Sequence, residues 1–262
     1  MDGTQTCTYA PLQGWSNTKK YAFFAFYPME EDLDEGSRRV NIIDGGKPTT
    51  YTSTAPTPAI KYTMDATSAD NLKASMVDVL TAAHKDQYWK SSTENSFINK
   101  QSDDFVLEFS HRLSSLEVSM KNSSSGTIKI NSLVLTISGI KNVSTIIPLD
   151  GNAQIPTALE DPMTATFTIN FEEDEKTIVA DPTRIKDKLI FIPQDEDISI
   201  AMSIEYTDSY SESSLEKVIT DLKTPLTEGC KHMLQLNFVD YNVYVMVVNE
   251  WENAPDVNHD FS

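Results

Sequence analysis

Hydrophobic and polar residues alternate along much of the chain with the period of two that is typical of β-strands. The longest example runs from Phe105 to Asn122, FVLEFSHRLSSLEVSMKN. Its inward-facing set consists of Phe105, Leu107, Phe109, His111 and Leu113, and then of Leu116, Val118 and Met120. Because neighbouring side chains point to opposite faces of a strand, the change of parity predicts one long strand with a bulge or corner between Leu113 and Leu116.

A second strand of the same kind follows at once. Ser123 to Gly126 is a turn sequence, and Thr127 to Gly139 reads as the return strand of a hairpin. Its apolar positions also change parity, between Ile130 and Leu133. Two paired strands in which the buried side chains both change parity predict a coiled hairpin over the edge of a β-sandwich.

Further apolar segments of strand length, bounded by turn residues, extend over the rest of the chain. In the first half they are Tyr21 to Tyr27, closed by Pro28, then Val40 to Ile43, and Ile60 to Met64 after an extended edge segment from Thr49. In the second half they are Ala165 to Phe171, Lys188 to Ile192, Ile198 to Tyr206, Ser214 to Leu222, Met233 to Val239 and Asn242 to Glu250. Strands at such short intervals predict an all-β sandwich architecture.

One segment, Ser68 to Ala83, has the helical period instead. Its apolar face consists of Leu72, Met76, Val79, Leu80 and Ala83. Ser68 is placed to cap the first turn of this helix. The polar residues from Lys85 to Asp104 then predict a long loop.

The length of 262 residues suits two domains, each with a core of its own. Leu149 to Asp161 contains Gly151 and Pro156, shows little alternation and is the best candidate for a linker. We therefore expect two β-sandwich domains in tandem, at residues 1–152 and 153–262.

Charge narrows the choice of partners. Lys and Arg total 21 against 39 Asp and Glu, a net charge of -18, which repels nucleic acid phosphates and anionic lipid surfaces. Nucleic acid is therefore excluded as a partner, and the apolar runs are far shorter than the roughly 20 residues of a membrane-spanning helix.

The N-terminal segment and the cysteines carry little targeting information. Met1 to Pro11 lacks the basic and apolar regions of a secretory signal, so either a leader lies outside this sequence or the protein is cytoplasmic. Polar residues precede Cys7, which does not match a lipobox. Cys7 and Cys230 have no neighbouring cysteine or histidine in a zinc-binding pattern, so no zinc site is indicated, and a bridge between them stays open.

The histidines and acidic clusters form no recognised catalytic or metal motif. His111 is predicted as a hydrogen-bonded core or interface residue, and His84, His232 and His259 as surface residues. Glu172 to Glu175 and Asp195 to Asp197 lack the spacing of a calcium loop and are predicted as solvated hairpin tips. A glycosidase carboxylate pair stays open, because space and not spacing defines it. The sequence thus assigns no catalytic, cofactor-binding or metal residue.

Aromatic residues offer one further kind of site. Trp15, Trp89 and Trp251 are the candidates for a carbohydrate-binding platform. Trp89 stands out because it follows Tyr88 in the polar loop, where no pattern demands burial. Trp251 ends an apolar strand and is expected in the core.

Several segments carry a resemblance to a known family. They are Tyr21 to Pro28 (YAFFAFYP), Ile60 to Thr63 with Asp70 to Ser75 (DNLKAS), Phe109 to Val118 (FSHRLSSLEV), Phe191 to Gln194 (FIPQ), and Glu228-Gly229 followed by strands to Trp251. In order and spacing they resemble the fimbrillin-like proteins, the subunits of type V pili and related surface lipoproteins of anaerobic gut and oral bacteria. FSHRLSSLEV is the most specific segment.

The resemblance implies two transthyretin-like β-sandwich domains, no catalysis, and export as a lipoprotein to the cell surface or outer membrane. It also implies other pilin subunits as partners, joined by donor-strand addition, in which a strand of one subunit completes the sheet of the next. Surface glycans or proteins of host or bacteria are further candidate partners.

Two features depart from the family pattern. Only 20 residues precede Tyr21, so we expect a shortened form or a variant without its own first strand. Arg38-Arg39 lies after the YAFFAFYP strand and does not match the position where an arginine-specific protease processes family members. Stalk, tip, anchor and non-polymerising roles all stay open, as does a secreted carbohydrate-binding protein on a sandwich scaffold.

Overall fold

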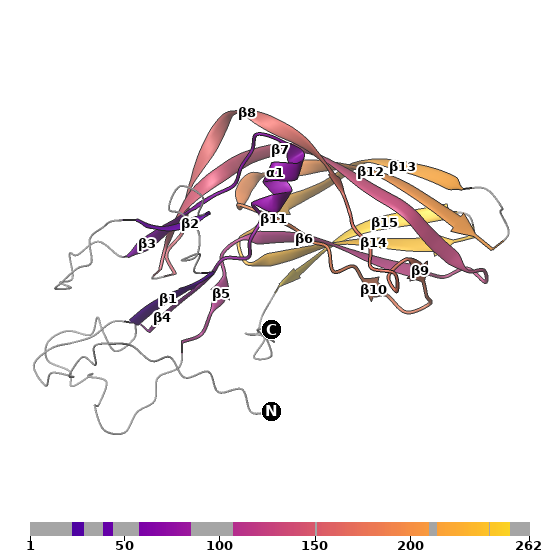
Figure 1. Cartoon of the computed structure of the whole chain (residues 1–262), viewed down its shortest axis with the longest axis horizontal. Helices are drawn as coiled ribbons and strands as arrows, with labels where there is room; N and C mark the ends of the chain where they lie inside the picture. Colours follow the sequence, from indigo (N-terminus) through magenta and orange to yellow (C-terminus); the bar gives the residue numbers. More distant parts are fainter. Residues whose placement is uncertain are drawn as a thin grey trace, which may run out of the picture.

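The structure is a computed structural model that describes residues 23–28, 39–43, 58–84, 107–149, 151–209, 214–240 and 242–251. The described part is almost entirely β-structure, with fifteen strands and one short helix. Figure 1 shows an elongated sandwich of two sheets, with the strands from the N-terminal part of the chain gathered at one end. The expected all-β class is therefore confirmed.

The largest sheet has seven strands and is built around the longest of them, β7. Its path is β13 (Leu215–Leu226), β12 (Gln194–Asp208), β7 (Ile128–Pro148), β3 (Ala59–Thr63) and β2 (Val40–Ile43), while β8 (Ile155–Thr168) and β9 (Thr177–Ile178) also pair with β7. All of these pairings are antiparallel.

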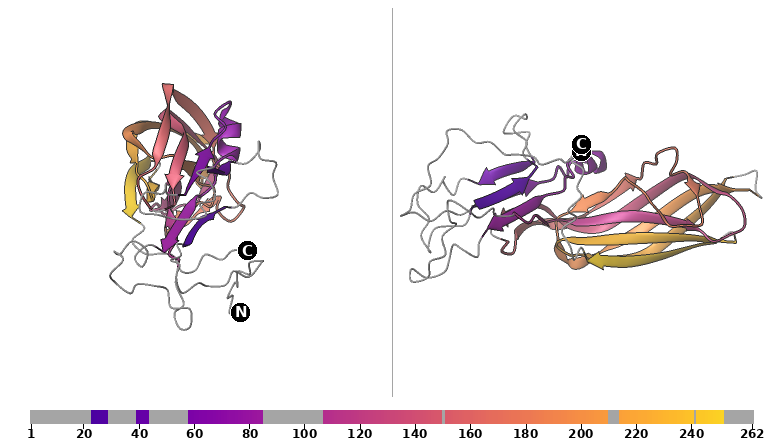
Figure 2. Two further views of the ribbon diagram at one scale, coloured as in Figure 1. Left: turned by 90° about the vertical axis from the view of Figure 1, so that its left-hand side faces the viewer. Right: turned by 90° about the horizontal axis from the view of Figure 1, so that it is seen from below.

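The second sheet of the sandwich has five strands, and a third, smaller sheet lies at the end of the molecule. The five-stranded sheet contains β10 (Thr183–Arg184), β6 (Ser114–Asn122), β14 (Cys230–Val239) and β15 (Asn242–Trp251), with β11 (Leu189–Phe191) also on β6. The three-stranded sheet contains β1 (Phe23–Tyr27), β4 (Leu80–His84) and β5 (Ser110–His111). Figure 2 shows the two larger sheets stacked face to face.

Apolar side chains from both larger sheets fill the space between them. From β7 and β12 come Leu133, Leu135, Ile137, Ile200, Met202 and Ile204, and from β6 and β14 come Leu116, Val118, Met120, Leu234, Leu236 and Phe238, all buried. Tyr206 and Phe238 meet edge to face across the interface, with ring centroids 5.2 Å apart. Burial of this apolar surface is the main contribution to the stability of the sandwich.

The segment from Phe105 to Asn122 contains the predicted corner, but it is not one strand. The chain leaves β5 after His111 and starts β6 at Ser114. The parity therefore changes where the chain passes from the small sheet to the five-stranded sheet. The Arg112 backbone N–H donates to Val79, whereas the Leu113 carbonyl accepts from Gly229. Phe109, expected inside, is 39% exposed, and Phe105 lies outside the described residues.

The predicted hairpin between β6 and β7 is wrong. β6 bonds to β10, β11 and β14, while β7 belongs to the opposite sheet, so the Ser123–Gly126 turn carries the chain across the sandwich. Asn122 holds this turn, because its side-chain oxygen accepts from the Ser124 N–H at 2.9 Å and its amide donates to the Gly126 carbonyl at 2.6 Å. Pairing with later strands, which local turn chemistry does not specify, decides the sheet of each strand.

The parity change in β7 is confirmed as a β-bulge. Tyr206 pairs with Ile130 and Glu205 with Ser132, so Asn131 is the extra residue. A second irregularity follows at Gly139, whose φ of +89° is the left-handed conformation that glycine adopts without strain. Here β7 leaves β12 and goes on to pair with β3.

The side chain of Gln194 bridges this second irregularity. Its amide donates to the Gly139 carbonyl at 2.9 Å, and its oxygen accepts from the Lys141 N–H at 3.0 Å. The Asn142 amide adds a bond to the Pro193 carbonyl at 2.7 Å. Polar side chains thus satisfy the backbone groups that the interrupted ladder leaves without strand partners.

The predicted linker is largely strand. Residues 155–161 of the Leu149 to Asp161 segment form the first half of β8, which pairs with β7 from Ile146↔Ile155 onward. Its single proline, Pro156, and its charges are accommodated because this part of β8 is exposed and its register with β7 is irregular. Both larger sheets contain strands from either side of residue 152. The division at residues 1–152 and 153–262 stays a prediction.

The helix is much shorter than predicted. α1 spans Ala69–Ala74, and Ser68 caps it as expected, since its hydroxyl accepts from the Asn71 N–H at 3.1 Å. The predicted C-terminal part of the helix, from Leu80, is strand β4. Tyr62 accounts for the stop: its hydroxyl donates to the Ser75 carbonyl and accepts from the Val77 N–H, at 3.1 and 3.3 Å.

The other predicted strands each overlap an observed strand, most with small shifts of their ends, but Ala165 to Phe171 shares only residues 165–168 with β8, which begins at Ile155. Val40 to Ile43 is β2, Ile60 to Met64 overlaps β3, and Tyr21 to Tyr27 overlaps β1. The predicted loop from Lys85 to Asp104 lies outside the described residues.

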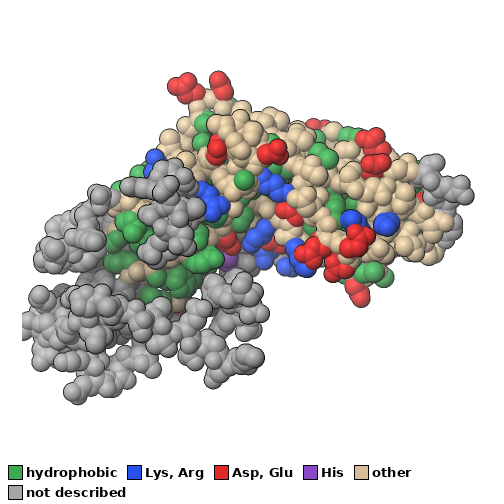
Figure 3. All heavy atoms as spheres, in the orientation of Figure 1, with side chains coloured by type: hydrophobic (Ala, Val, Ile, Leu, Met, Phe, Trp, Pro, Cys, Tyr) green, Lys and Arg blue, Asp and Glu red, His purple; other side chains and the backbone are tan. Residues whose placement is uncertain are grey.

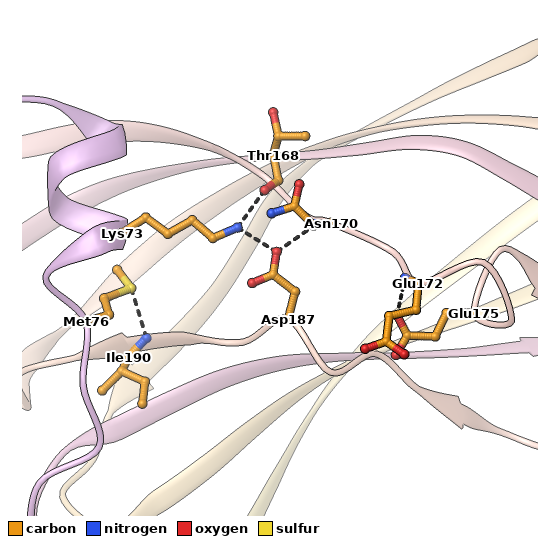
Figure 4. A network of polar contacts seen from close by, with 8 residues as sticks. All are labelled: Lys73, Met76, Thr168, Asn170, Glu172, Glu175, Asp187 and Ile190. Carbon is orange, nitrogen blue, oxygen red and sulfur yellow. Dashed lines mark hydrogen bonds and ion pairs between the residues drawn. The ribbon is translucent and has the colours of Figure 1, made fainter. Parts of the chain in front are cut away.

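Polar contacts attach α1 to the sandwich, as Figure 4 shows. The Lys73 ammonium lies 2.6 Å from an oxygen of Asp187 and donates to the Thr168 carbonyl at 2.8 Å. The same Asp187 oxygen accepts from the Asn170 N–H at 2.7 Å. The helix therefore holds the end of β8 against the segment that leads into β11.

Candidate functional site

Strand β15 forms one edge of the five-stranded sheet and has the properties of a strand-pairing surface. It pairs with β14 over ten positions, from Val239↔Asn242 to Cys230↔Trp251, and within the described part of the chain with no other strand. Residues 242–249, NVYVMVVN, contain no charge and no proline. A long, regular, uncharged edge of this kind is a template for another β-strand.

Strand β13 forms the corresponding edge of the seven-stranded sheet but is poorly suited to pairing. Asp221 has a φ of +64°, and the register with β12 shifts between Ile200 and Met202. Pro225 lacks an N–H, and the strand also carries Lys217 and Lys223. Bulges, prolines and lysines are the features by which natural sheets block their edges.

The inner side chains of these two edge strands are incompletely covered. Leu215, Ile219 and Leu222 of β13 and Val243, Val245 and Val247 of β15 pack against the core but are only half-buried. The central strands of the same sheets have inner residues such as Ile200 and Leu234 that are almost fully buried. The sandwich is therefore partly open along this side, and Figure 2 shows β15, in yellow, at its margin.

The outer face of β15 is also apolar in places. Tyr244 and Met246 are 61% and 62% exposed and lie two residues apart on the same face. Figure 3, which views the molecule from one side, shows hydrophobic side chains gathered mainly over the N-terminal strands, where Tyr27 and Ile42 are exposed. Exposed apolar residues of this size are common at interaction surfaces.

A buried arginine organises the junction between the small sheet and the sandwich. The Arg112 side chain is 4% exposed, and its Nε lies 2.8 Å from Oε1 of Glu228, an ion pair without hydrogen-bond geometry. Its Nη2 donates to the Asn152 carbonyl at 2.6 Å, and the Gln154 amide donates to the Arg112 carbonyl. The guanidinium thus connects the turn that contains Glu228 with the segment between β7 and β8 that contains Asn152.

His111 forms a hydrogen bond at the surface of this junction, which agrees with the prediction of an interface histidine. Its Nδ1 lies 2.9 Å from Oδ1 of Asp78, and Lys188 lies 3.5 Å from the other oxygen of that carboxylate. Burial opposes ionisation of Asp78, but the hydrogen bond and charge of His111 and the charge of Lys188 outweigh it and lower the pKa of Asp78. Sequence analysis missed Asp78 and Lys188 because no local pattern brings them together.

The prediction that His232 is a surface residue is wrong. His232 lies on the inner face of β14 with no exposed area. Its Nδ1 is 3.2 Å from the Thr224 hydroxyl, and its Nε2 accepts from the Thr227 N–H at 3.4 Å. Its parity with Leu234 and Leu236 was the signal for burial. His84 lies in β4, and its side chain and all of His259 fall outside what the structure describes.

The acidic clusters are held by lysines and backbone groups. Glu172 to Glu175 includes a turn, but it is not the predicted solvated hairpin tip, because it connects β8 to β9, which both pair with β7 and not with each other. Glu175 is buried and accepts from the N–H groups of Glu172 and Lys186 at 2.8 and 2.9 Å. Asp195 to Asp197 is exposed but lies in an irregular part of β12 and not at a hairpin tip, and Glu196 pairs with Lys141 at 2.5 Å.

Neither cluster forms a metal site. Among the described residues, no group of three or more His, Cys, Asp and Glu side chains is arranged to hold a metal ion. On the face in Figure 3 acidic side chains are spread over several places.

The comparison with known protein families decides the identity of the chain. A family model described as fimbrillin-like matches residues 1–251. This chain belongs to the fimbrillin-like family. No curated protein matches it.

Solved structures similar to this fimbrillin-like chain are distant in sequence. A fimbrial protein from Bacteroides vulgatus is 15% identical, covers 87% of this chain and 76% of its own, and has a TM-score of 0.48. A candidate cell adhesion protein from Bacteroides ovatus is 12% identical, with coverages of 88% and 67% and a TM-score of 0.45. One from Bacteroides uniformis is 14% identical, with coverages of 87% and 72% and a TM-score of 0.42.

The segments that suggested the family from sequence meet one another in the fold. FSHRLSSLEV supplies Arg112 and Leu113, which contact Glu228 and Gly229 of another such segment. FIPQ supplies Gln194, which bridges the irregularity of β7, and DNLKAS supplies Ser75, bonded to Tyr62. Two pairs of these segments are thus in direct contact: Phe109 to Val118 with Glu228-Gly229, and Ile60 to Thr63 with Asp70 to Ser75.

The aromatic candidates and the cysteines give this fimbrillin-like chain no further site in the described structure. Trp15, Trp89 and the side chain of Trp251 lie outside the described residues, as does Cys7. Cys230 is buried, forms no disulfide with a described residue, and burial raises the pKa of its thiol. No helix in the described ranges is long and apolar enough to cross a membrane.

Proposed function

We propose that this fimbrillin-like chain is a structural and adhesive subunit of a bacterial surface pilus, and that β15 is an edge at which a strand from another subunit pairs. Its family supports the pilus role. The observation that carries the choice of edge is the regular pairing of β15, which is uncharged over residues 242–249, in contrast to β13, which is blocked by a bulge and a proline.

Strand addition at β15 follows from backbone chemistry. An edge strand presents a row of N–H and C=O groups, and a donor strand satisfies them with a ladder of hydrogen bonds. Alternate side chains of the donor would cover the half-buried valines of β15, Val243, Val245 and Val247, and the half-buried Ile219 of β13. The donor required is an extended segment with apolar residues at every second position.

The finer features implied by the family enter as parts of the same proposal. They are a tandem transthyretin-like organisation, a non-catalytic role, and export as a lipoprotein to the cell surface or outer membrane. A division into two domains requires that some strands of the N-terminal part unfold separately from the sandwich. Limited proteolysis followed by thermal unfolding of the fragments tests this division.

Hydrogen exchange tests the edge directly. The full chain is concentrated and examined by electron microscopy for fibres, and the exchange of β15 amides is compared between monomer and assembly. We expect amide protection in β15 to rise on assembly, because the edge N–H groups gain partners. Fibres in which β15 exchanges as in the monomer would rule out this edge.

A matched pair of variants distinguishes a loss of strand pairing at β15 from a general effect of added charge on solubility. Val245→Lys places a charge on the inner side of the β15 edge, and Val218→Lys places the same charge on an exposed position of β13. We expect Val245→Lys to block assembly and Val218→Lys to leave it intact, with both chains folded by circular dichroism. Equal assembly by the two variants would refute the role of β15.

A further inference from the structure

Lys217 is a charged residue on the inner side of the β13 edge. It lies between Leu215 and Ile219, which pack against the core, and it pairs directly with the buried Ile204 of β12. Because directly opposed residues of an antiparallel pair point to the same face, the Lys217 side chain points toward the space between the sheets, where it is half-buried. Lysine is rarely placed on the inner face of a sheet, so this position needs a physical reason.

Within the described strands, Lys217 is the only charge on the inner side of this margin of the sandwich. Every other inner position of β13, and each inner position from Val243 to Val247 of β15, is uncharged. We call the inner side chains at this margin the seam; they are those of Leu215, Lys217, Ile219, Val243, Val245 and Val247. Among the residues that the structure describes, the Lys217 ammonium has no hydrogen bond or ion pair. The seam thus contains one positive charge that no described side chain neutralises.

Lys217 lies level with Val245 of β15. The hairpins β12–β13 and β14–β15 both turn at the end of the sandwich where residues 123–126 cross between the sheets. Leu215 and Val243 are level there, because their strand partners are the two aromatic rings that meet between the sheets, 5.2 Å apart. Lys217 and Val245 each follow two residues later. A residue that pairs with Val245 from an added strand would therefore point into the seam toward Lys217.

We propose that the strand added at β15 carries an acidic residue opposite Val245, and that Lys217 selects it. This inference rests on the proposed function, because it names the chemistry of the donor at the same edge. The inner donor residues on either side of the acidic one are apolar and cover Val243 and Val247. The carboxylate accepts from the Lys217 ammonium, whose long and flexible stem lets it reach across the margin from the opposite sheet.

The charge of the seam favours a carboxylate over an apolar or a basic residue at this position. When a donor strand covers the seam, an ammonium beside apolar side chains loses water without gaining a partner, which is costly. A carboxylate replaces the lost water with an ion pair, whereas a lysine of the donor would meet a like charge. The same charge disfavours symmetric pairing of two β15 edges about Val245, because that arrangement brings the Lys217 ammonium groups of both copies together.

Titration of the ¹⁵N-labelled full chain with matched strand peptides tests the proposal. The probes are acetyl-Thr-Val-Thr-Glu-Thr-Val-Thr-amide and the same peptide with glutamine in place of glutamate, which place the two valines and the central residue on one face. We expect NMR shifts of β15 amides and an affinity about threefold or more higher for the glutamate peptide. The net charge of -18 repels that peptide, so a general charge effect predicts the opposite order.

Variants assign the preference to Lys217. Lys217→Met should abolish it, and Lys217→Glu should reverse it in favour of a peptide with lysine at the centre, with both chains folded by circular dichroism. Lys223→Met removes the same charge from an exposed position of β13 that faces away from the seam, and should keep the preference. If Lys217 only blocks the edge, the unaltered chain shows no preference and Lys217→Met strengthens the binding of both peptides equally, which would refute selection.

The outcomes separate this inference from the proposed function. Equal affinity for the glutamate and glutamine peptides with shifts in β15, or a preference that survives Lys217→Met, overturns selection by Lys217 and leaves strand addition at β15 intact. Absence of saturable binding by either peptide also overturns the inference, whereas hydrogen exchange of the assembly decides the edge. Shifts confined to strands other than β15 would overturn both.

Discussion

The Nε of Arg112 lies 2.8 Å from Oε1 of Glu228, and through this contact the segment between β5 and β6 is joined to the turn between β13 and β14. Arg112 is buried, whereas Glu228 keeps about a third of its side chain in contact with solvent. The two partners therefore differ in what each would lose if the other were removed.

Removal of either side chain tests this asymmetry. We expect Arg112→Met to lower the free energy of unfolding by about 2–4 kcal/mol, because the Asn152 carbonyl loses this partner as well. Glu228→Gln keeps that bond but leaves a buried guanidinium without this counterion, and should cost a similar or greater amount. Urea unfolding measures both, and losses below about 0.5 kcal/mol for both variants would show that the junction is not organised by this pair.

The pair of Asp78 with His111 predicts a dependence of stability on pH. The pKa of Asp78 is lowered in the folded chain, so the unfolded chain binds the proton more readily. The ionised Asp78 therefore stabilises the folded chain fully above the pKa of about 3.9 that an aspartate has in the unfolded chain. This stabilisation is lost as the pH falls through the lower pKa of Asp78 in the folded chain.

Comparison with Asp78→Asn isolates this effect. The difference in free energy of unfolding between the two proteins should be constant just above about pH 5 and shrink as the pH is lowered below about 4. Chemical denaturation at a series of pH values gives the curve. A difference that grows on acidification would contradict the lowered pKa.

Buried His232 predicts a large loss of stability on truncation. His232→Ala leaves a cavity and removes the acceptor of the Thr227 N–H, so we expect a loss of about 2–4 kcal/mol in the free energy of unfolding. Thr224→Val removes one hydrogen bond of the same site and should cost about 1 kcal/mol. If His232→Ala is as stable as the unaltered chain, the residue is not in the core.

Substitution of Gly139 should lower the free energy of unfolding through the backbone conformation alone. Gly139→Ala forces a side chain onto a φ of +89° and should lower the free energy of unfolding by about 1–2 kcal/mol. Gly126 has no positive φ, so Gly126→Ala should change stability by less than about 0.5 kcal/mol. Equal effects of the two substitutions in urea unfolding would contradict the conformation at Gly139.

Local patterns predicted most of the strands, because alternation along a strand depends on residues close in sequence. The parity change in β7 is an example, since Ile130 and Leu133 alone imply the bulge that pairing with β12 reveals. The helix cap at Ser68 is another. The end of that helix was not predictable, because it depends on Tyr62, which reaches Ser75 and Val77 from strand β3.

Partners distant in sequence explain the other corrections. His232 was assigned to the surface by its chemistry, although its parity places it among the core residues of β14, where Thr224 and Thr227 supply its hydrogen bonds. The contacts of Asp78 with His111 and with Lys188 join three segments that are distant in sequence, and no spacing within one segment indicates them. The β15 edge becomes a candidate site when the neighbours of each strand are known.

The sequence by itself determined that this chain is an all-β member of the fimbrillin-like family, since alternation and family-like segments are properties of the linear order of residues. The tertiary structure decided that β6 and β7 belong to opposite sheets, that residues 155–161 form a strand, and that β15 is an edge strand among the residues that the structure describes. The physical reason is that a strand specifies its buried face through its own side chains, but finds its neighbours through backbone hydrogen bonds, which are the same for every residue except proline.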